Sequence, residues 1–167
     1  ITVSNTKAIN VNTTIDGGGK ITLSGNNLRR IFNVAGGVTL TLRNITIANG
    51  FANTSDGGAI VGLQGSTLII ENSTFRENRS SGYSGGALLI LGTATIRNSH
   101  FEKNSAENGG AIYVRWENSS LTIENSTFVE NEAVNVTDGW GGAILTWDGA
   151  EAIVRDSTFT GNKARRG

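Results

Sequence analysis

One short block of sequence returns five times along the chain, and it limits the possible folds more than any other feature. The copies are LRNITIAN at Leu42–Asn49, IENSTFREN at Ile70–Asn78, IRNSHFEKN at Ile96–Asn104, IENSTFVEN at Ile123–Asn131 and VRDSTFTGN at Val154–Asn162. A second block, GGA plus an aliphatic residue, begins at Gly57, Gly85, Gly109 and Gly141. The Asn or Asp of the first block recurs after 28, 26, 27 and 31 residues. A period of this length predicts a solenoid, in which equivalent positions form columns.

The sequence of a single repeat, such as Gly57–Ser84, predicts strands and turns. It consists of short β-prone runs broken by Gly, Asn and Ser, and the chain lacks the 3.6-residue apolar period of helices. Three short strands in about 27 residues are typical of a right-handed parallel β-helix, because the hexapeptide rhythm of the left-handed form is missing. We therefore expect an all-β fold of about six turns in one domain, 1–167, with opening turns in 1–50 and regular repeats in 51–167.

Alternation within each strand predicts which side chains face the core. Before the repeated Asn, the inward pairs are Leu40/Leu42, Leu68/Ile70, Ala94/Ile96, Leu121/Ile123 and Ala152/Val154. After it, one apolar column is expected from Ile47, Phe75, Phe101, Phe128 and Phe159. In the GGA strand, the inward pairs are Ile60/Gly62, Leu88/Ile90, Ile112/Val114 and Ile144/Thr146.

Two further kinds of column follow from the same alignment. The residue before the repeated Asn alternates in charge at every turn, in the order Arg43, Glu71, Arg97, Glu124 and Arg155. Stacking in this register pairs opposite charges, whereas other registers bring like charges together. The polar residues of the block predict two structural columns, one of Asn44, Asn72, Asn98, Asn125 and Asp156 and the other of Asn78, Asn104, Asn131 and Asn162. Asn at a bend hydrogen-bonds its neighbour and the turn backbone.

These blocks resemble the GGA[ILV]…FxxN repeats of chlamydial-type polymorphic outer-membrane proteins and related β-helix repeats of bacterial surface proteins. The opening segment Thr14–Gly50, TIDGGGKITLSGNNLRRIFNVAGGVTLTLRNITIANG, is similar to the start of such bacterial domains. The resemblance covers nearly the whole chain and implies adhesion and display at the cell surface. It brings no catalytic residues with it, because the repeats specify a fold more than a function.

Composition excludes several classes of function. The formal net charge is zero, which offers no basic surface for nucleic acid. The chain has no cysteine, and no apolar run is long enough for a transmembrane helix. It begins at Ile1 and contains no methionine, so we expect it to be processed or cut from a longer precursor. We therefore expect a secreted or cell-surface location, with Asn53, Asn118 and Asn135 as loop candidates for N-glycosylation.

An enzymatic function is not expected, although many right-handed β-helices cleave polysaccharides. Glycoside cleavage needs carboxylates that converge on one groove, and the nearest candidates, Asp138 and Asp148, lie in separate predicted loops. His100 occupies a position that is Thr in other repeats, which favours surface variation over general-base catalysis. No cofactor or metal site is predicted, because the calcium-binding G-G-x-G-x-D motif is missing.

The outward side of the GGA strand is the candidate interface, because this strand is apolar on both sides. Its members are Val61, Leu63, Leu89, Leu91, Tyr113, Trp116, Leu145 and Trp147. Three occupants remain open: a loop of the same chain such as Val134–Trp140, a subunit or neighbouring domain, or a sugar stacked on Tyr113, Trp116 and Trp147.

The predicted function is a non-catalytic structural or adhesive solenoid. Open strand edges at both ends predict self-association, end to end into an extracellular filament or by lateral packing. Other surface proteins and glycans are further candidate partners. The alternatives are a carbohydrate-binding or polysaccharide-lyase-like protein and, from the Thr-x-Thr pairs such as Thr39/Thr41 and Thr93/Thr95, an ice-binding protein.

Overall fold

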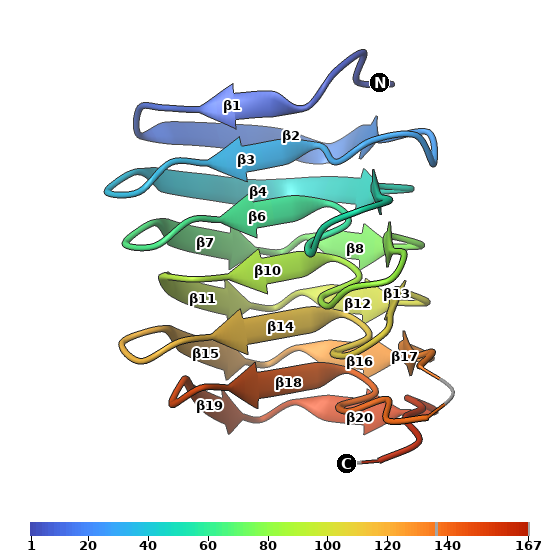
Figure 1. The fold of residues 1–167 in the computed structure, drawn as a ribbon. Helices are drawn as coiled ribbons and strands as arrows, with labels where there is room; N and C mark the ends of the chain where they lie inside the picture. The colour runs from blue at the N-terminus through green and yellow to red at the C-terminus, as the bar shows by residue number, and fades with distance from the viewer. Residues whose placement is uncertain (136, 167) are drawn as a thin grey trace.

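A computed structural model describes residues 1–135 and 137–166. Over these residues the fold contains strands and no helix. The chain winds as a right-handed coil of about six stacked turns, with its two termini at opposite ends of the stack (Figure 1). The predicted fold class is therefore confirmed.

Equivalent strands pair in parallel from turn to turn and form three sheets. The GGA sheet, named after its sequence block, is ordered β1 (Lys7–Ile9), β3 (Phe32–Val34), β6 (Ile60–Gly62), β10 (Leu88–Ile90), β14 (Ile112–Arg115) and β18 (Ile144–Trp147). The short sheet contains β5 (Phe51–Ala52), β9 (Arg79–Ser80), β13 (Ser105–Ala106) and β17 (Glu132–Ala133).

The third sheet, called the long sheet, holds the repeated Asn blocks. It begins with two long strands, β2 (Thr13–Ser24) and β4 (Thr39–Ala48). Each later turn has two short strands in place of one long strand. The pairs are β7 (Thr67–Glu71) and β8 (Thr74–Arg76), β11 (Thr93–Arg97) and β12 (His100–Glu102), β15 (Ser120–Glu124) and β16 (Thr127–Val129), and β19 (Glu151–Arg155) and β20 (Thr158–Thr160). The sheet therefore bends at the Asn-Ser or Asp-Ser pair between them.

The core is built from the columns expected from the sequence. Phe75 pairs with Phe101 and Phe101 with Phe128 in the β-ladder, and all three side chains are completely buried. Their rings are parallel, with centroids 4.8 and 4.9 Å apart, and Phe159 continues the stack at 4.8 Å. The ring spacing equals the distance between neighbouring strands, so register alone places the aromatic groups face to face.

The two asparagine columns have different structural roles. In the column headed by Asn78, Asn78, Asn104 and Asn131 are buried, and each of these amides is hydrogen-bonded to the turns on both sides, whereas Asn162 is half-buried and bonded only to preceding turns. The Asn104 Nδ2 donates to the Phe75 carbonyl at 3.0 Å and to Asn131 Oδ1 at 2.9 Å, while Asn104 Oδ1 accepts from the backbone N–H of Asn78 at 3.0 Å. Because buried polar groups must be paired, this column ties three successive turns together.

The other column serves backbone geometry. Asn72, Asn98 and Asn125 are exposed and have φ of 48°, 49° and 48°, in the left-handed region that Asn tolerates better than most residues. Asn44, at φ 51°, and Asp156, at φ 48°, adopt the same conformation. These residues make the bend in the long sheet.

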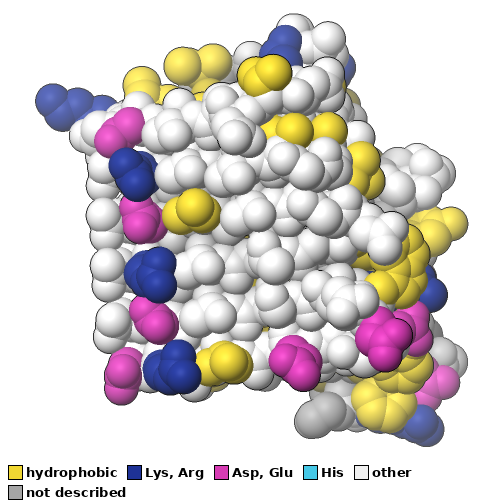
Figure 2. All heavy atoms as spheres, turned by 90° about the vertical axis from the view of Figure 1, so that its left-hand side faces the viewer, with side chains coloured by type: hydrophobic (Ala, Val, Ile, Leu, Met, Phe, Trp, Pro, Cys, Tyr) yellow, Lys and Arg dark blue, Asp and Glu magenta, His cyan; other side chains and the backbone are white. Residues whose placement is uncertain are grey.

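The alternating charges lie on top of one another next to the bend of the long sheet, and Figure 2 shows them as a column of alternating acidic and basic side chains. Arg43 Nε lies 2.7 Å from Glu71 Oε2, and Arg97 Nε lies 2.8 Å from Glu124 Oε2. The ladder adds one member that the alignment had not included, because Asp16 pairs with Arg43 in register. Each exposed pair contributes only about 0–1 kcal/mol, so the main effect is on register.

The first prediction separates the two asparagine columns. Asn104→Ala leaves the buried Asn78 N–H without its partner and removes one donor from the Phe75 carbonyl, so we expect a loss of about 2–4 kcal/mol in unfolding free energy. Asn98→Ala should cost only about 1 kcal/mol, the penalty of a left-handed alanine, and Asn98→Gly should be close to neutral. Denaturant unfolding of the three variants measures this, and equal losses for Asn104→Ala and Asn98→Ala would contradict it.

The second prediction concerns the charge ladder. Arg97→Glu places three carboxylates in consecutive turns, so we expect a loss of about 1–2 kcal/mol at low ionic strength, most of which disappears in 1 M salt where the Debye length is about 3 Å. Arg97→Gln is the matched control and should cost about 0–1 kcal/mol. A salt-independent loss for Arg97→Glu would show that charge is not the cause.

Candidate functional site

The outward side of the GGA sheet is only partly open to solvent. Val61, Leu89 and Tyr113 are buried and pack together in a cluster separate from the main core. Leu91 and Leu145 pack against this cluster and are half-buried, whereas Leu63, Trp116 and Trp147 are exposed. The eight residues of the predicted interface therefore do not form one continuous exposed patch, and three of them are not available to a partner.

Loops of the same chain cover the buried part. The segments that precede the GGA strands are hydrogen-bonded from turn to turn, as the strands are. The N–H groups of Gly57, Gly85 and Gly109 donate to the backbone carbonyls of Ser84, Asn108 and Trp140, respectively. At Gly57 the φ is +69°, and an added Cβ would lie 2.7 Å from Val61 Cγ2. The glycine repeat is thus required both by backbone conformation and by the close approach of each loop to the outward side chains.

Arg30 holds the first of these loops in place. Its guanidinium donates to the Gly57 carbonyl at 2.9 Å and to the Asp56 carbonyl at 2.6 Å. Burial lowers the pKa of Arg30, and the nearby Asp56 carboxylate acts in the opposite direction. The Asp56 carboxylate also accepts from the Ser84 N–H at 2.6 Å, so the loop is joined to the next turn.

A cleft of about 230 Å³ lies where this cover ends, beside β14 and β18. Its lining consists of Ser84, Asn108, Tyr113, Asn135, Asp138, Trp140, Leu145 and Trp147. The rings of Trp140 and Trp147 have centroids 6.4 Å apart and are tilted by 57°. The sequence analysis named Tyr113, Leu145 and Trp147 for this surface but gave Trp140 only as the end of a candidate covering loop, because the position of a loop residue depends on contacts that no repeat pattern specifies.

The charged groups around the cleft are mostly paired. Arg166 lies over the Trp140 ring at 5.8 Å and forms an ion pair of 2.9 Å with Asp138. Arg115 pairs with Asp148 at 2.8 Å, and this hydrogen bond raises the pKa of Arg115. The two carboxylates considered for catalysis are therefore each held by an arginine.

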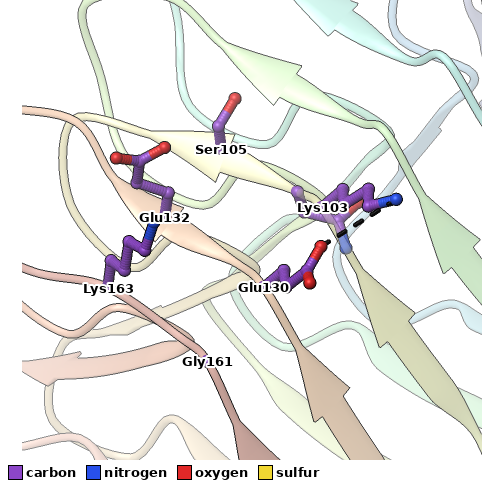
Figure 3. A pocket seen from close by; sticks show the side chains of 7 residues that line it. Lys103, Ser105, Glu130, Glu132, Gly161 and Lys163 are labelled. Atoms are coloured by element: carbon purple, nitrogen blue, oxygen red, sulfur yellow. Dashed lines mark ion pairs between the residues drawn. The ribbon is translucent and has the colours of Figure 1, made fainter.

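A second hollow, of about 440 Å³, lies beside the short sheet near the C-terminal end. Figure 3 shows Lys103, Glu130, Glu132 and Lys163 around it. Lys103 Nζ is 3.9 Å from Glu130 Oε2, and Glu132 lies beside Lys163 on the neighbouring turn. The two acidic and two basic side chains alternate, so the hollow has no net charge. It therefore continues the pairing of opposite charges that the charge ladder of the long sheet shows.

The remaining sequence candidates are dispersed over the surface. His100 Nδ1 hydrogen-bonds the Thr127 hydroxyl, and Nε2 lies 3.5 Å from Glu102 Oε2. Asn53 and Asn118 are exposed, whereas Asn135 is half-buried and its Oδ1 accepts from the N–H groups of Thr137 and Asp138. Among residues 1–135 and 137–166, no cluster of three or more His, Cys, Asp or Glu is arranged to hold a metal ion. In the same ranges no helix is long and apolar enough to cross a membrane.

Comparison with known proteins agrees with this geometry. The family described as "Right handed beta helix region" matches residues 2–165, which is nearly the whole chain. The chain belongs to this family. The narrower resemblance to polymorphic outer-membrane proteins stays a prediction.

This β-helix is also similar to a curated protein, the metabotropic glutamate receptor-like protein R of Dictyostelium discoideum. The two are 36% identical over 104 residues, which are 59% of the β-helix and 6% of the receptor-like protein. The β-helix therefore spans only a small part of that relative's length. No solved structure matches the chain.

The third prediction tests the loop cover of this β-helix. Leu89→Ala removes a buried side chain from the outward cluster, so we expect a core-like loss of about 2–3 kcal/mol in unfolding free energy. Leu63→Ala, directly after β6 and 40% exposed, should cost about 0.5 kcal/mol. Similar losses in urea unfolding would mean that the loops do not cover Leu89 in solution.

Proposed function

We propose that this β-helix is a non-catalytic structural or adhesive element of a secreted or cell-surface protein, and that copies of it associate end to end. The observation that carries the structural role is that column side chains contact their equivalents in neighbouring turns, as in the Phe75–Phe101–Phe128 stack and the ion pairs of Glu71 and Glu124. End-to-end association concerns copies of the 167-residue chain, and the last described turn bears on it. Val154 is 42% exposed and Phe159 is 44% exposed, whereas the equivalent side chains of the preceding turn, Ile123 and Phe128, are completely buried. This turn presents an apolar layer and two unpaired strand edges, β19 and β20, with which either a second copy or a following turn of a longer protein can pair.

The charge ladder supports a second copy as the next layer. The ladder ends in Arg155 and begins, at the opposite end of the stack, with Asp16. Hydrogen bonds from the Gly18 N–H and from Asn44 lower the pKa of Asp16, so it is a carboxylate at neutral pH. When one first turn stacks on another copy's last turn in register, Asp16 faces Arg155 and the alternation continues. This contact requires β20 to replace residues 1–3, whose backbone pairs with Ser24 at the same edge. A heterologous contact of this kind repeats and produces a filament.

A structural role also agrees with the way in which the acidic groups are used. Glu71, Glu124 and Glu130 are paired with basic side chains of neighbouring turns. Carboxylates engaged in this way stabilise register and are poorly placed to act as an acid and base pair on a bound polysaccharide. The surface setting is further supported by the receptor-like name of the Dictyostelium relative.

The fourth prediction is that the 167-residue chain associates with rising concentration, which sedimentation velocity and negative-stain electron microscopy measure. Phe159→Asp should abolish association, because it places a charge on the stacking surface. Ile153→Asp is the matched control: Ile153 is 47% exposed in the same turn but faces sideways, so association should persist.

Charge exchange tests the register of the contact. Arg155→Glu should weaken association, and the double variant Asp16→Arg with Arg155→Glu should restore it, because the opposite charges are then exchanged across the contact. A chain that stays monomeric at every concentration, or association that Phe159→Asp leaves unchanged, would contradict end-to-end stacking. In a longer protein, a further turn that covers Phe159 would also contradict end-to-end stacking.

A further inference from the structure

We propose that the cleft beside β14 and β18 binds a neutral sugar residue of an oligosaccharide. This site lies on the side of the stack and does not depend on end-to-end association. The inference rests on the aromatic walls of the cleft, the polar groups that open into it, and its charge.

The aromatic walls provide surfaces on which the C–H faces of a sugar ring can pack. Trp147 is 49% exposed and Trp140 is 37% exposed, and both line the cleft. The tilt of 57° between the rings leaves a wedge rather than a stacked pair. Arg166 covers one part of Trp140, whereas in the described residues no cation lies over the ring of Trp147. Large exposed indole surfaces next to polar groups are characteristic of binding sites.

The polar groups in the cleft suit hydroxyl groups. Tyr113 is largely buried but lines the cleft, and within the described residues its hydroxyl makes no hydrogen bond. Burial raises the pKa of Tyr113, so the group is a neutral hydrogen-bond donor and acceptor. Asn108 uses its Oδ1 to accept from the Trp140 N–H at 3.0 Å, which leaves its Nδ2 as a donor.

Charge and size favour a neutral sugar unit. The one charged side chain in the described lining is the Asp138 carboxylate, which is paired with Arg166. The pair leaves the cleft without a free cation in its described lining for the acidic sugars of pectin-like polymers, while the carboxylate oxygens can accept from neutral hydroxyl groups. The volume of about 230 Å³ is below the roughly 300–1,000 Å³ of clefts that enclose drug-sized ligands, so a single sugar unit fits better than a longer segment.

The fifth prediction is tested with titration calorimetry and tryptophan fluorescence, with cellobiose, lactose and diacetylchitobiose as neutral probes and digalacturonic acid as the acidic probe. We expect at least one neutral disaccharide to bind and digalacturonic acid to bind more weakly. Trp147→Ala should weaken binding about tenfold or more, the effect of removing an aromatic contact at the centre of a site. Trp116→Ala is the matched control, because Trp116 follows β14 but lies outside the cleft lining, and it should leave binding unchanged.

Tyr113→Phe distinguishes a sugar from an apolar protein side chain. It keeps the buried ring and removes only the hydroxyl, so sugar binding should weaken about two- to tenfold, with circular dichroism and thermal unfolding unchanged. The absence of binding to all three neutral disaccharides overturns the proposal, as does binding that survives Trp147→Ala. Binding of N-acetyl-tryptophanamide in place of the sugars, unaffected by Tyr113→Phe, would assign the cleft to a protein partner. The same titrations in Phe159→Asp keep this result separate from end-to-end association.

Discussion

Parallel pairing of each strand with its equivalent in the next turn is the constraint from which the other features of this β-helix follow. The register places Phe101 over Phe75 and Arg97 over Glu71, so like residues stack in the core and opposite charges stack at the surface. Inside, the same register brings each amide of the Asn78 column within hydrogen-bonding distance of the next. One error of register would therefore leave buried polar groups unpaired and like charges adjacent.

This constraint also limits where a function can lie. Most side chains in the columns contact their equivalents in neighbouring turns. Ile96 is buried in such a column, and Glu124 forms an ion pair in another. The positions that are free to differ from turn to turn are in the loops before the GGA strands and at the strand ends. The aromatic cleft is made at such positions, since Trp140 comes from a loop and Trp147 from the last residue of β18. A regular solenoid thus carries an irregular site only where the loops vary.

The two proposals use different parts of the molecule and different interactions. End-to-end association depends on the apolar layer at Phe159 and on the opposite charges at the two ends of the ladder. Sugar binding depends on Trp147 and the Tyr113 hydroxyl on the lateral surface. A filament formed through its ends would display one copy of the lateral cleft in every subunit, which would give weak sugar binding a high avidity.

The repeat pattern was sufficient to predict the fold, the inward columns and the alternation of charge, because a parallel register requires equivalent residues to stack and a one-dimensional alignment already contains that information. It was not sufficient for the outward side of the GGA sheet. Val61 and Trp147 were both assigned to the outward side, in neighbouring columns, yet Val61 is buried and Trp147 is exposed. The path of a loop depends on contacts with residues distant in the chain, such as Arg30 with Gly57 and Arg166 with Trp140. No periodicity encodes such contacts, so the cleft emerged only when the chain was folded.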